Sequence, residues 1–203
     1  ADATGIAGEK LVAEVAVENL AGHKLPTAYP SRRVWIHFAL KNAAGEVVFE
    51  SGALEPDGSI AGNDNDRDGT RFEPHHQVIG APDRVQIYEA VMQTRGGGVT
   101  TGLMEAYGYV KDNRLLPRGF DKASADPDVA VHGAAREDGS FAAGRDRVRY
   151  EVLVEAGPGP YTITAELWSV GMCGEDPLLL TTKGERFQIR FEQWPDMVFM
   201  CDA

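Results

Sequence analysis

Apolar and polar residues alternate along much of this chain with the period of two that is typical of β-strands. Ten short segments are predicted to be strands: Lys10–Glu18, Arg33–Lys41, Glu46–Ser51, His76–Ile79, Val85–Gln93, Thr100–Val110, Val129–Ala134, Arg147–Glu155, Tyr161–Ser169 and Arg186–Phe191. Almost no segment has the period of a helix. About ten short strands predict an all-β fold, namely an antiparallel, immunoglobulin-like (Ig-like) β-sandwich.

The segments between these strands have the composition of turns. Asn42–Gly45 and Arg95–Gly98 are typical of hairpin loops, and Ala156–Pro160 forms a third turn. Residues 111–128 are predicted to form one long irregular loop and residues 192–203 a C-terminal tail. The chain has 203 residues, of which 43% are hydrophobic, so we expect one domain over residues 1–203.

The chain is acidic, with 20 Lys and Arg against 31 Asp and Glu and a formal net charge of −11. This charge repels phosphate backbones, so nucleic acid is not an expected partner. No apolar run approaches the roughly 18 residues of a membrane-spanning helix. The Ala-Asp start is compatible with cleavage after a secretory signal, and equally with a trimmed or partial chain.

The loop between the first two strands carries one histidine, His23, among residues that restrict the backbone. Gly22 precedes it, and Pro26 and Pro30 follow within the same loop. Proline fixes φ and biases the residue before it toward extended geometry, which narrows the paths open to His23. An imidazole presented in this way suits a metal or haem iron. The alternative is a surface histidine beside a turn that serves only strand register.

A second loop, Gly62–Thr70, carries an acidic motif. Asp64, Asp66 and Asp68 recur at every second position and Gly69 follows them, an arrangement typical of calcium-binding loops. Three carboxylates this close need a counter-charge, which Ca²⁺ supplies. We therefore predict a structural calcium site formed by Asp64, Asp66, Asp68 and the carbonyl of Thr70.

The acidic motif does not match an EF-hand, and it also has an interpretation without calcium. The twelfth position counted from Asp64 holds His75 rather than glutamate, which excludes an EF-hand. In the alternative interpretation the loop is a solvated acidic turn, with Arg67 and Arg71 as its counter-ions.

The other histidines give one further candidate ligand. His75 and His76 are adjacent, and neighbouring side chains of an extended segment point to opposite faces, so at most one serves a given site. Either His75 or His76 could be a second ligand, and His75 is the candidate haem ligand considered beside His23. His37 and His132 are interpreted as structural residues.

The two cysteines, Cys173 and Cys201, exclude one kind of cofactor attachment. Neither belongs to a C-x-x-C-H motif, so this chain cannot hold haem c covalently, and any haem c is held by another segment or chain. The two cysteines form either one disulfide or two free thiols. The sequence contains no G-x-S-x-G, H-E-x-x-H or phosphate-binding glycine motif, so we expect no catalytic activity of its own.

Four segments share a pattern with a known family: Asn19–His37, Gly62–His75, Val85–Ala90 and Lys111–Lys122. They resemble the haem-free C-terminal domain of bacterial multihaem c-type cytochromes, over about Val15–Leu167. In that family the domain is a β-sandwich beside a haem-bearing region, exported to the periplasm or cell exterior. The resemblance implies that His23 is a distal ligand to a haem attached elsewhere. The chain differs from the family in having Ala28 where glycine is frequent, and in lacking the haem-bearing region.

Two functional hypotheses follow. In the first, the chain is an electron-transfer accessory domain or subunit that packs on a multihaem cytochrome and offers a distal histidine to its haem. In the second, it is a calcium-stabilised extracellular binding or adhesion module that recognises a glycan or a protein. A third possibility, a subunit that binds haem b without a covalent bond, requires an apolar pocket that a sequence does not reveal.

Overall fold

The computed structural model describes residues 10–27, 30–154, 160–170, 188–190 and 198–200. Its strands are β1 (Lys10–Glu18), β2 (Arg33–Lys41), β3 (Val47–Ser51), β4 (Val78–Ile79), β5 (Ile87–Tyr88), β6 (Ala90–Gln93), β7 (Val99–Thr100), β8 (Gly108–Asp112), β9 (Arg145–Leu153), β10 (Thr162–Val170), β11 (Gln188–Arg190) and β12 (Val198–Met200). The helical turns are α1 (Asp64–Arg67), η1 (Pro127–Val129) and η2 (Ala134–Arg136). Both cysteines lie outside the described residues.

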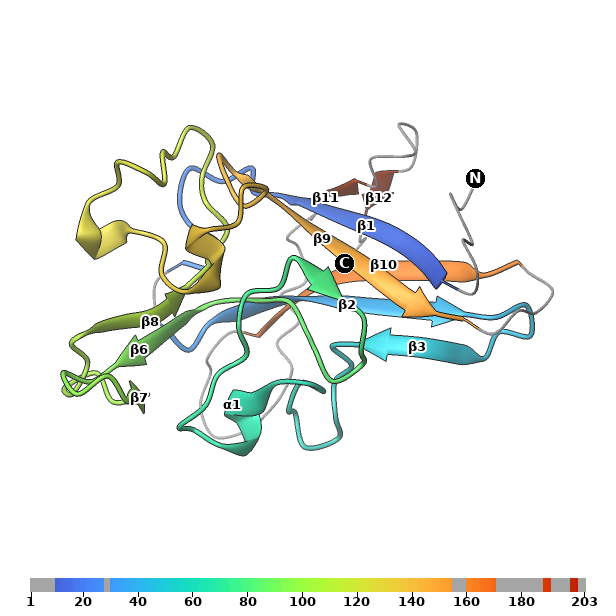
Figure 1. The fold of residues 1–203 in the computed structure, drawn as a ribbon, viewed down its shortest axis with the longest axis horizontal. Coiled ribbons are helices and arrows are strands. Elements are labelled where there is room, and N and C mark those ends of the chain that lie inside the picture. Colours follow the sequence, from blue (N-terminus) through green and yellow to red (C-terminus); the bar gives the residue numbers. More distant parts are fainter. Residues whose placement is uncertain (1–9, 28–29, 155–159, 171–187, 191–197, 201–203) are drawn as a thin grey trace.

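The strands form sheets that are mainly antiparallel, and the predicted all-β sandwich is confirmed. One sheet has the order β12-β11-β1-β9-β4, and another has the order β10-β2-β3 with β5 also paired to β2 (Figure 1). A third, smaller sheet has the order β7-β6-β8. One pairing differs from the antiparallel prediction, because β4 runs parallel to β9.

The first two sheets enclose the main core. Alternate residues of β2 point into it and pack against β1 and β9; the fully buried members include Val15, Ile36, Phe38, Leu40, Val148 and Tyr150. The rings of Phe38 and Tyr150 stack with centroids 3.9 Å apart, which joins one sheet to the other. A smaller cluster around Trp35 covers the opposite face of β2. Both faces of β2 are therefore buried, one in the main core and the other in the Trp35 cluster.

Three predicted strands are divided or interrupted in the structure, and a fourth, His76–Ile79, is shortened to β4. The segment Thr100–Val110 is divided, because a turn with exposed Leu103 and Met104 separates β7 from β8. The segment Val85–Gln93 is divided at Glu89, whose N–H donates to the side chain of Asn113 instead of to a neighbouring strand. The segment Val129–Ala134 is not a continuous strand.

The residues around His132 explain this last difference. His132 makes an isolated bridge with Asp112, and their backbones exchange two hydrogen bonds of 3.1 Å. Gly133 follows with a φ of +76°, which turns the chain into η2. The irregular connection between β8 and β9 is therefore longer than predicted, and it begins after Asp112. It lies above the β6–β8 end of the molecule in Figure 1.

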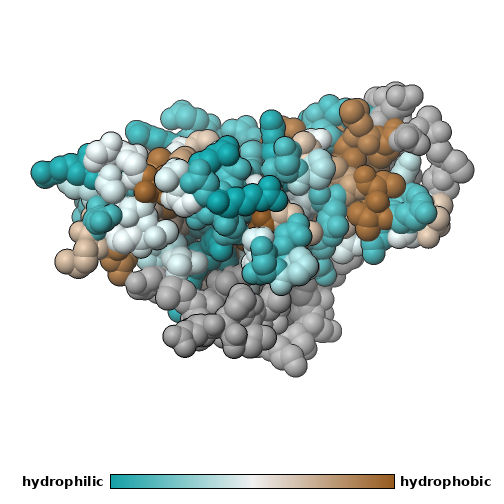
Figure 2. All heavy atoms as spheres, turned by 90° about the horizontal axis from the view of Figure 1, so that it is seen from below, coloured by the Kyte–Doolittle hydropathy of each residue, from teal (hydrophilic) through white to brown (hydrophobic). Residues whose placement is uncertain are grey.

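Most of one face of the molecule is hydrophilic (Figure 2). Apolar residues gather toward the end of this face that β3 occupies, where Val47 and Val48 are 50% and 45% exposed. β3 lies at the edge of its sheet.

Candidate functional site

The loop that carries His23 is held in place by the buried side chain of Asn19. Asn19 is 1% exposed, and its amide nitrogen donates to the carbonyls of His23 at 2.8 Å, Leu115 at 3.0 Å and Leu116 at 3.2 Å. Its amide oxygen accepts the N–H of Ala21 at 2.9 Å. One side chain therefore ties the His23 loop to a segment almost 100 residues further along the chain.

An ion pair makes a second attachment between the same two segments. Lys24 Nζ lies 2.8 Å from Asp112 Oδ2, and Arg114 Nη2 lies 2.7 Å from the same oxygen. Burial alone raises the pKa of Asp112, but hydrogen bonds and charge from Arg114 and Lys24 bring it below its usual value. Burial lowers the pKa of Lys24 despite the opposing effect of Asp112. Leu25 and Leu115 add two backbone hydrogen bonds of 2.9 and 2.8 Å.

His23 itself is exposed, and its own backbone neighbour orients its ring. Nδ1 lies 2.9 Å from the carbonyl oxygen of Lys24. A carbonyl oxygen only accepts, so Nδ1 carries a proton, and in the neutral imidazole the lone pair is on Nε2. Within the described part of the chain, Nε2 has no hydrogen-bond partner. The neutral imidazole with an available Nε2 is the form that binds a metal ion or haem iron.

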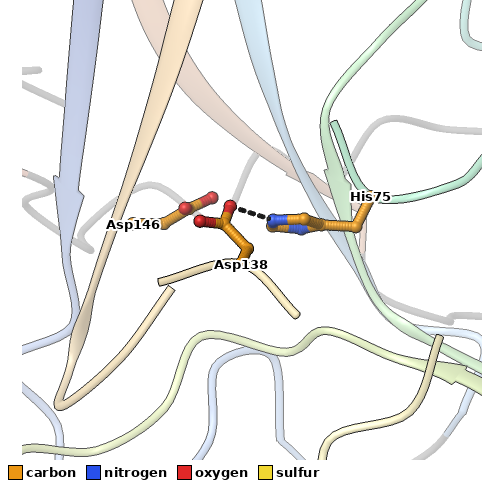
Figure 3. A group of neighbouring side chains, drawn as sticks. All are labelled: His75, Asp138 and Asp146. Atoms are coloured by element: carbon orange, nitrogen blue, oxygen red, sulfur yellow. Dashed lines mark hydrogen bonds and ion pairs between the residues drawn. The ribbon is translucent and has the colours of Figure 1, made fainter. Parts of the chain in front are cut away.

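His75 lies in a different environment, a buried polar cluster shown in Figure 3. Its Nε2 lies 2.9 Å from Asp138 Oδ2. Its Nδ1 faces the amide nitrogens of Gln86 at 2.7 Å and Asn113 at 3.1 Å. His75 is therefore buried and bonded at both nitrogens, whereas His23 is exposed, and iron could reach a nitrogen of His75 only after a buried hydrogen bond broke.

Neighbouring backbone groups fix the orientation of both amides. The side-chain oxygen of Gln86 accepts the N–H of His76, and that of Asn113 accepts the N–H of Glu89. The two NH₂ groups therefore point at His75 Nδ1, which must be unprotonated, and the proton is on Nε2. The cluster fixes one neutral tautomer of His75.

This tautomer decides whether the cluster fits a metal. Ligand atoms of His75, Asp138 and Asp146 lie within 4.8 Å of one another, a spacing compatible with a shared ion. A metal on Nε2 would place the ring proton on Nδ1, facing two N–H donors. The residues therefore do not fit a metal ion in this arrangement. Burial raises the pKa of Asp146, which accepts hydrogen bonds from Tyr88 and Gln86 at 2.7 and 3.2 Å.

The carboxylates of the acidic loop each have a protein partner. Asp64 pairs with Arg71 at 2.7 Å, and Asp66 pairs with Arg33 at 2.5 Å. Asp68 accepts hydrogen bonds from the N–H and hydroxyl of Thr70, which lower its pKa. In the described residues these carboxylates do not gather into a cluster that could share an ion. The arrangement resembles the alternative acidic turn, with Arg33 in place of Arg67, and calcium at this loop stays a prediction.

His37 has contacts of the structural kind expected for it. Its ring stacks on Trp168 with centroids 4.2 Å apart. Its two nitrogens lie 3.1 Å from Glu166 and 2.8 Å from Glu50, on the strands at either side of β2. His37 thus bridges three strands.

No protein-family model, curated protein or solved structure matches this chain. None of the helices in the described ranges has the length and apolar character needed to traverse a bilayer.

Proposed function

We propose that this chain is an electron-transfer accessory domain or subunit that packs on the haem-bearing region of a multihaem c-type cytochrome. In this proposal His23 is the distal ligand of a haem that another segment or chain holds, in the periplasm or outside the cell. One observation carries the proposal: His23 is exposed, and its Nδ1 is bonded to the carbonyl of Lys24, so Nε2 is the nitrogen that the neutral ring can offer to iron.

The surroundings of His23 support this role. A hydrogen bond from the second ring nitrogen to a carbonyl is how proteins commonly orient a ligating histidine. Asn19 and the Lys24–Asp112 pair hold the loop against the 112–116 segment, so binding of iron to His23 should cost little conformational entropy. The partner's haem would supply the redox chemistry, while this chain would orient the ligand and cover the haem edge.

A haem peptide tests the proposal directly. The probe is an N-acetylated, C-amidated haem c peptide without acidic side chains, which has one axial histidine and an open sixth position. We expect the protein to convert its absorption spectrum to that of a six-coordinate low-spin haem, and we expect H23A to abolish the conversion. H132A is the matched control, because His132 is a half-buried histidine on another loop. An unchanged conversion in H23A would overturn the proposal.

The second hypothesis, a calcium-stabilised adhesion module, gains less support. It depends on the acidic loop, whose carboxylates are bonded to Arg33, Arg71 and Thr70. We therefore do not propose it.

A further inference from the structure

Positive charge gathers near His23 in a protein that is acidic as a whole. Arg118 Nη2 and Arg145 Nη2 both approach Glu18 Oε1, at 2.9 and 3.8 Å. Two guanidinium groups thus share one carboxylate, which leaves one positive charge in excess. The Lys24–Asp112–Arg114 cluster also has two cations and one carboxylate. Both excesses stand out against the formal net charge of −11.

Asn19 places these arginines beside the His23 loop. Its side-chain nitrogen bonds the carbonyls of both His23 and Leu116, so those two oxygens are no further apart than two hydrogen-bond lengths. Its backbone N–H donates to the carbonyl of Gly144 at 2.7 Å. Arg118 follows Leu116 by two residues, and Arg145 follows Gly144 directly. The backbone of both arginines therefore lies close to Asn19, at the start of the loop that presents the imidazole.

The two clusters differ in how accessible their cations are. The side chains of Arg118 and Arg145 are 65% and 58% exposed. Those of Lys24 and Arg114 are only 11% and 18% exposed, and they are occupied in holding the loop. Arg118 and Arg145 are therefore the cations that an approaching anion can reach. Leu20 on the same loop is 59% exposed and offers an apolar surface.

We propose that Arg118 and Arg145 bind the propionate carboxylates of the haem whose iron His23 ligates. This inference rests on the proposed function for the identity of the ligand, and it adds a second recognition element to the site. A guanidinium presents paired N–H donors that match a carboxylate, and Glu18 neutralises only one of the two. Both propionates leave the same edge of the macrocycle, so two adjacent arginines can be engaged together.

The test compares charge variants with two forms of the haem peptide. The double variant R118Q/R145Q removes both arginine charges. The control R67Q/R71Q removes two exposed arginine charges near α1, where Arg71 is 63% exposed and also paired with a carboxylate. Affinity is measured by calorimetry, and ligation is measured from the haem absorption spectrum.

We expect R118Q/R145Q to bind the free-acid peptide about three- to tenfold more weakly at low ionic strength, with the control unchanged. The difference should disappear with the propionate dimethyl ester, and also in about 0.5 M salt. Equal loss of affinity for the acid and the ester would overturn the inference, because the arginines would then act on another part of the probe. Wild-type affinity of the double variant for the acid would overturn it as well.

The two proposals can fail separately. If the wild type shows no low-spin spectrum but binds the acid peptide through Arg118 and Arg145, the ligand role of His23 is wrong and the propionate site stands. If the spectrum depends on His23 but not on the arginines, the reverse holds.

Discussion

The side-chain amide of Asn19 donates to the carbonyl oxygen of His23 at 2.8 Å, four residues further along the chain. The same buried nitrogen reaches the 115–116 segment, so the position of the candidate ligand depends on a contact between distant parts of the sequence. A buried donor shared among three carbonyls makes Asn19 the residue whose loss should disturb the site most.

N19A should lower the free energy of unfolding by about 2–4 kcal/mol, because it removes three hydrogen bonds and leaves the buried carbonyl of Leu116 without its donor, while Leu115 keeps the N–H of Leu25. N42A is the matched control, since Asn42 bonds backbone N–H groups of an exposed hairpin turn, and it should cost about 1 kcal/mol or less. Urea denaturation measures both. N19A should also weaken binding of the haem peptide, and equal effects of the two variants would contradict this role.

D112N tests the ion pair beneath the loop. Asp112 has a lowered pKa in the folded protein, so its stabilising contribution is fully present above about pH 4 and is lost as the pH falls through the folded pKa. D112N should cost about 3–5 kcal/mol at pH 7, because Lys24 and Arg114 lose their buried carboxylate. The loss should shrink in acid. Urea denaturation at about pH 7 and pH 3 checks the sign, and a loss independent of pH would contradict it.

Y88F tests the buried cluster around Asp146, whose pKa is raised whereas that of Asp112 is lowered. Burial raises the pKa of Asp146, and the Tyr88 hydroxyl opposes this by donating to its carboxylate at 2.7 Å. Without that donor the pKa of Asp146 should rise further. Y88F should cost about 1.5–3 kcal/mol at neutral pH and less once the pH falls through the folded pKa and Asp146 is protonated. A pH titration of the Asp146 carboxyl carbon by NMR measures this pKa. The control Y107F, at a tyrosine that is 68% exposed, should leave the pKa of Asp146 unchanged.

Alanine substitutions at two glycines distinguish the stability cost of backbone strain from the cost of a steric clash. Gly52 has a φ of +77°, and a Cβ there would lie 2.6 Å from the carbonyl oxygen of Ile36. Gly97 has a φ of +85° with no atom within 4 Å of such a Cβ. G97A should therefore cost about 1–2 kcal/mol, and G52A about 3–5 kcal/mol. Thermal or urea unfolding decides the matter, and similar costs would show that the contact with Ile36 relaxes freely.

Strong alternation allowed the fold class and several strands to be predicted from sequence. Lys10–Glu18 and Arg33–Lys41 have the predicted bounds, because their inward residues are almost all large and apolar. Val129–Ala134 has a similar apolar content, but two 3₁₀ turns and Gly133 replace most of its expected pairing. Local composition cannot distinguish these cases, since the difference depends on which partner backbone is near.

The candidate site was predictable only in part. The composition of its loop pointed to His23, and the adjacent pair His75–His76 gave His75 as the second candidate, but nothing local distinguished an exposed histidine from a buried one. Asn19, Asp112 and Asn113 were missed, because an isolated Asn or Asp in a sequence gives no sign of a partner many residues away. Their roles follow from the tertiary contacts.

The anchoring of the His23 loop has a practical consequence for anyone who wishes to transplant it. A synthetic peptide that spans the loop would carry the imidazole and both prolines, yet it would lack the carbonyls of Leu115 and Leu116 and the carboxylate of Asp112. Grafting onto a new scaffold would have to move two discontinuous pieces of backbone together, the loop and the 112–116 segment. Evolution faces the same constraint, so the loop and its distant supports are expected to be inherited as one unit.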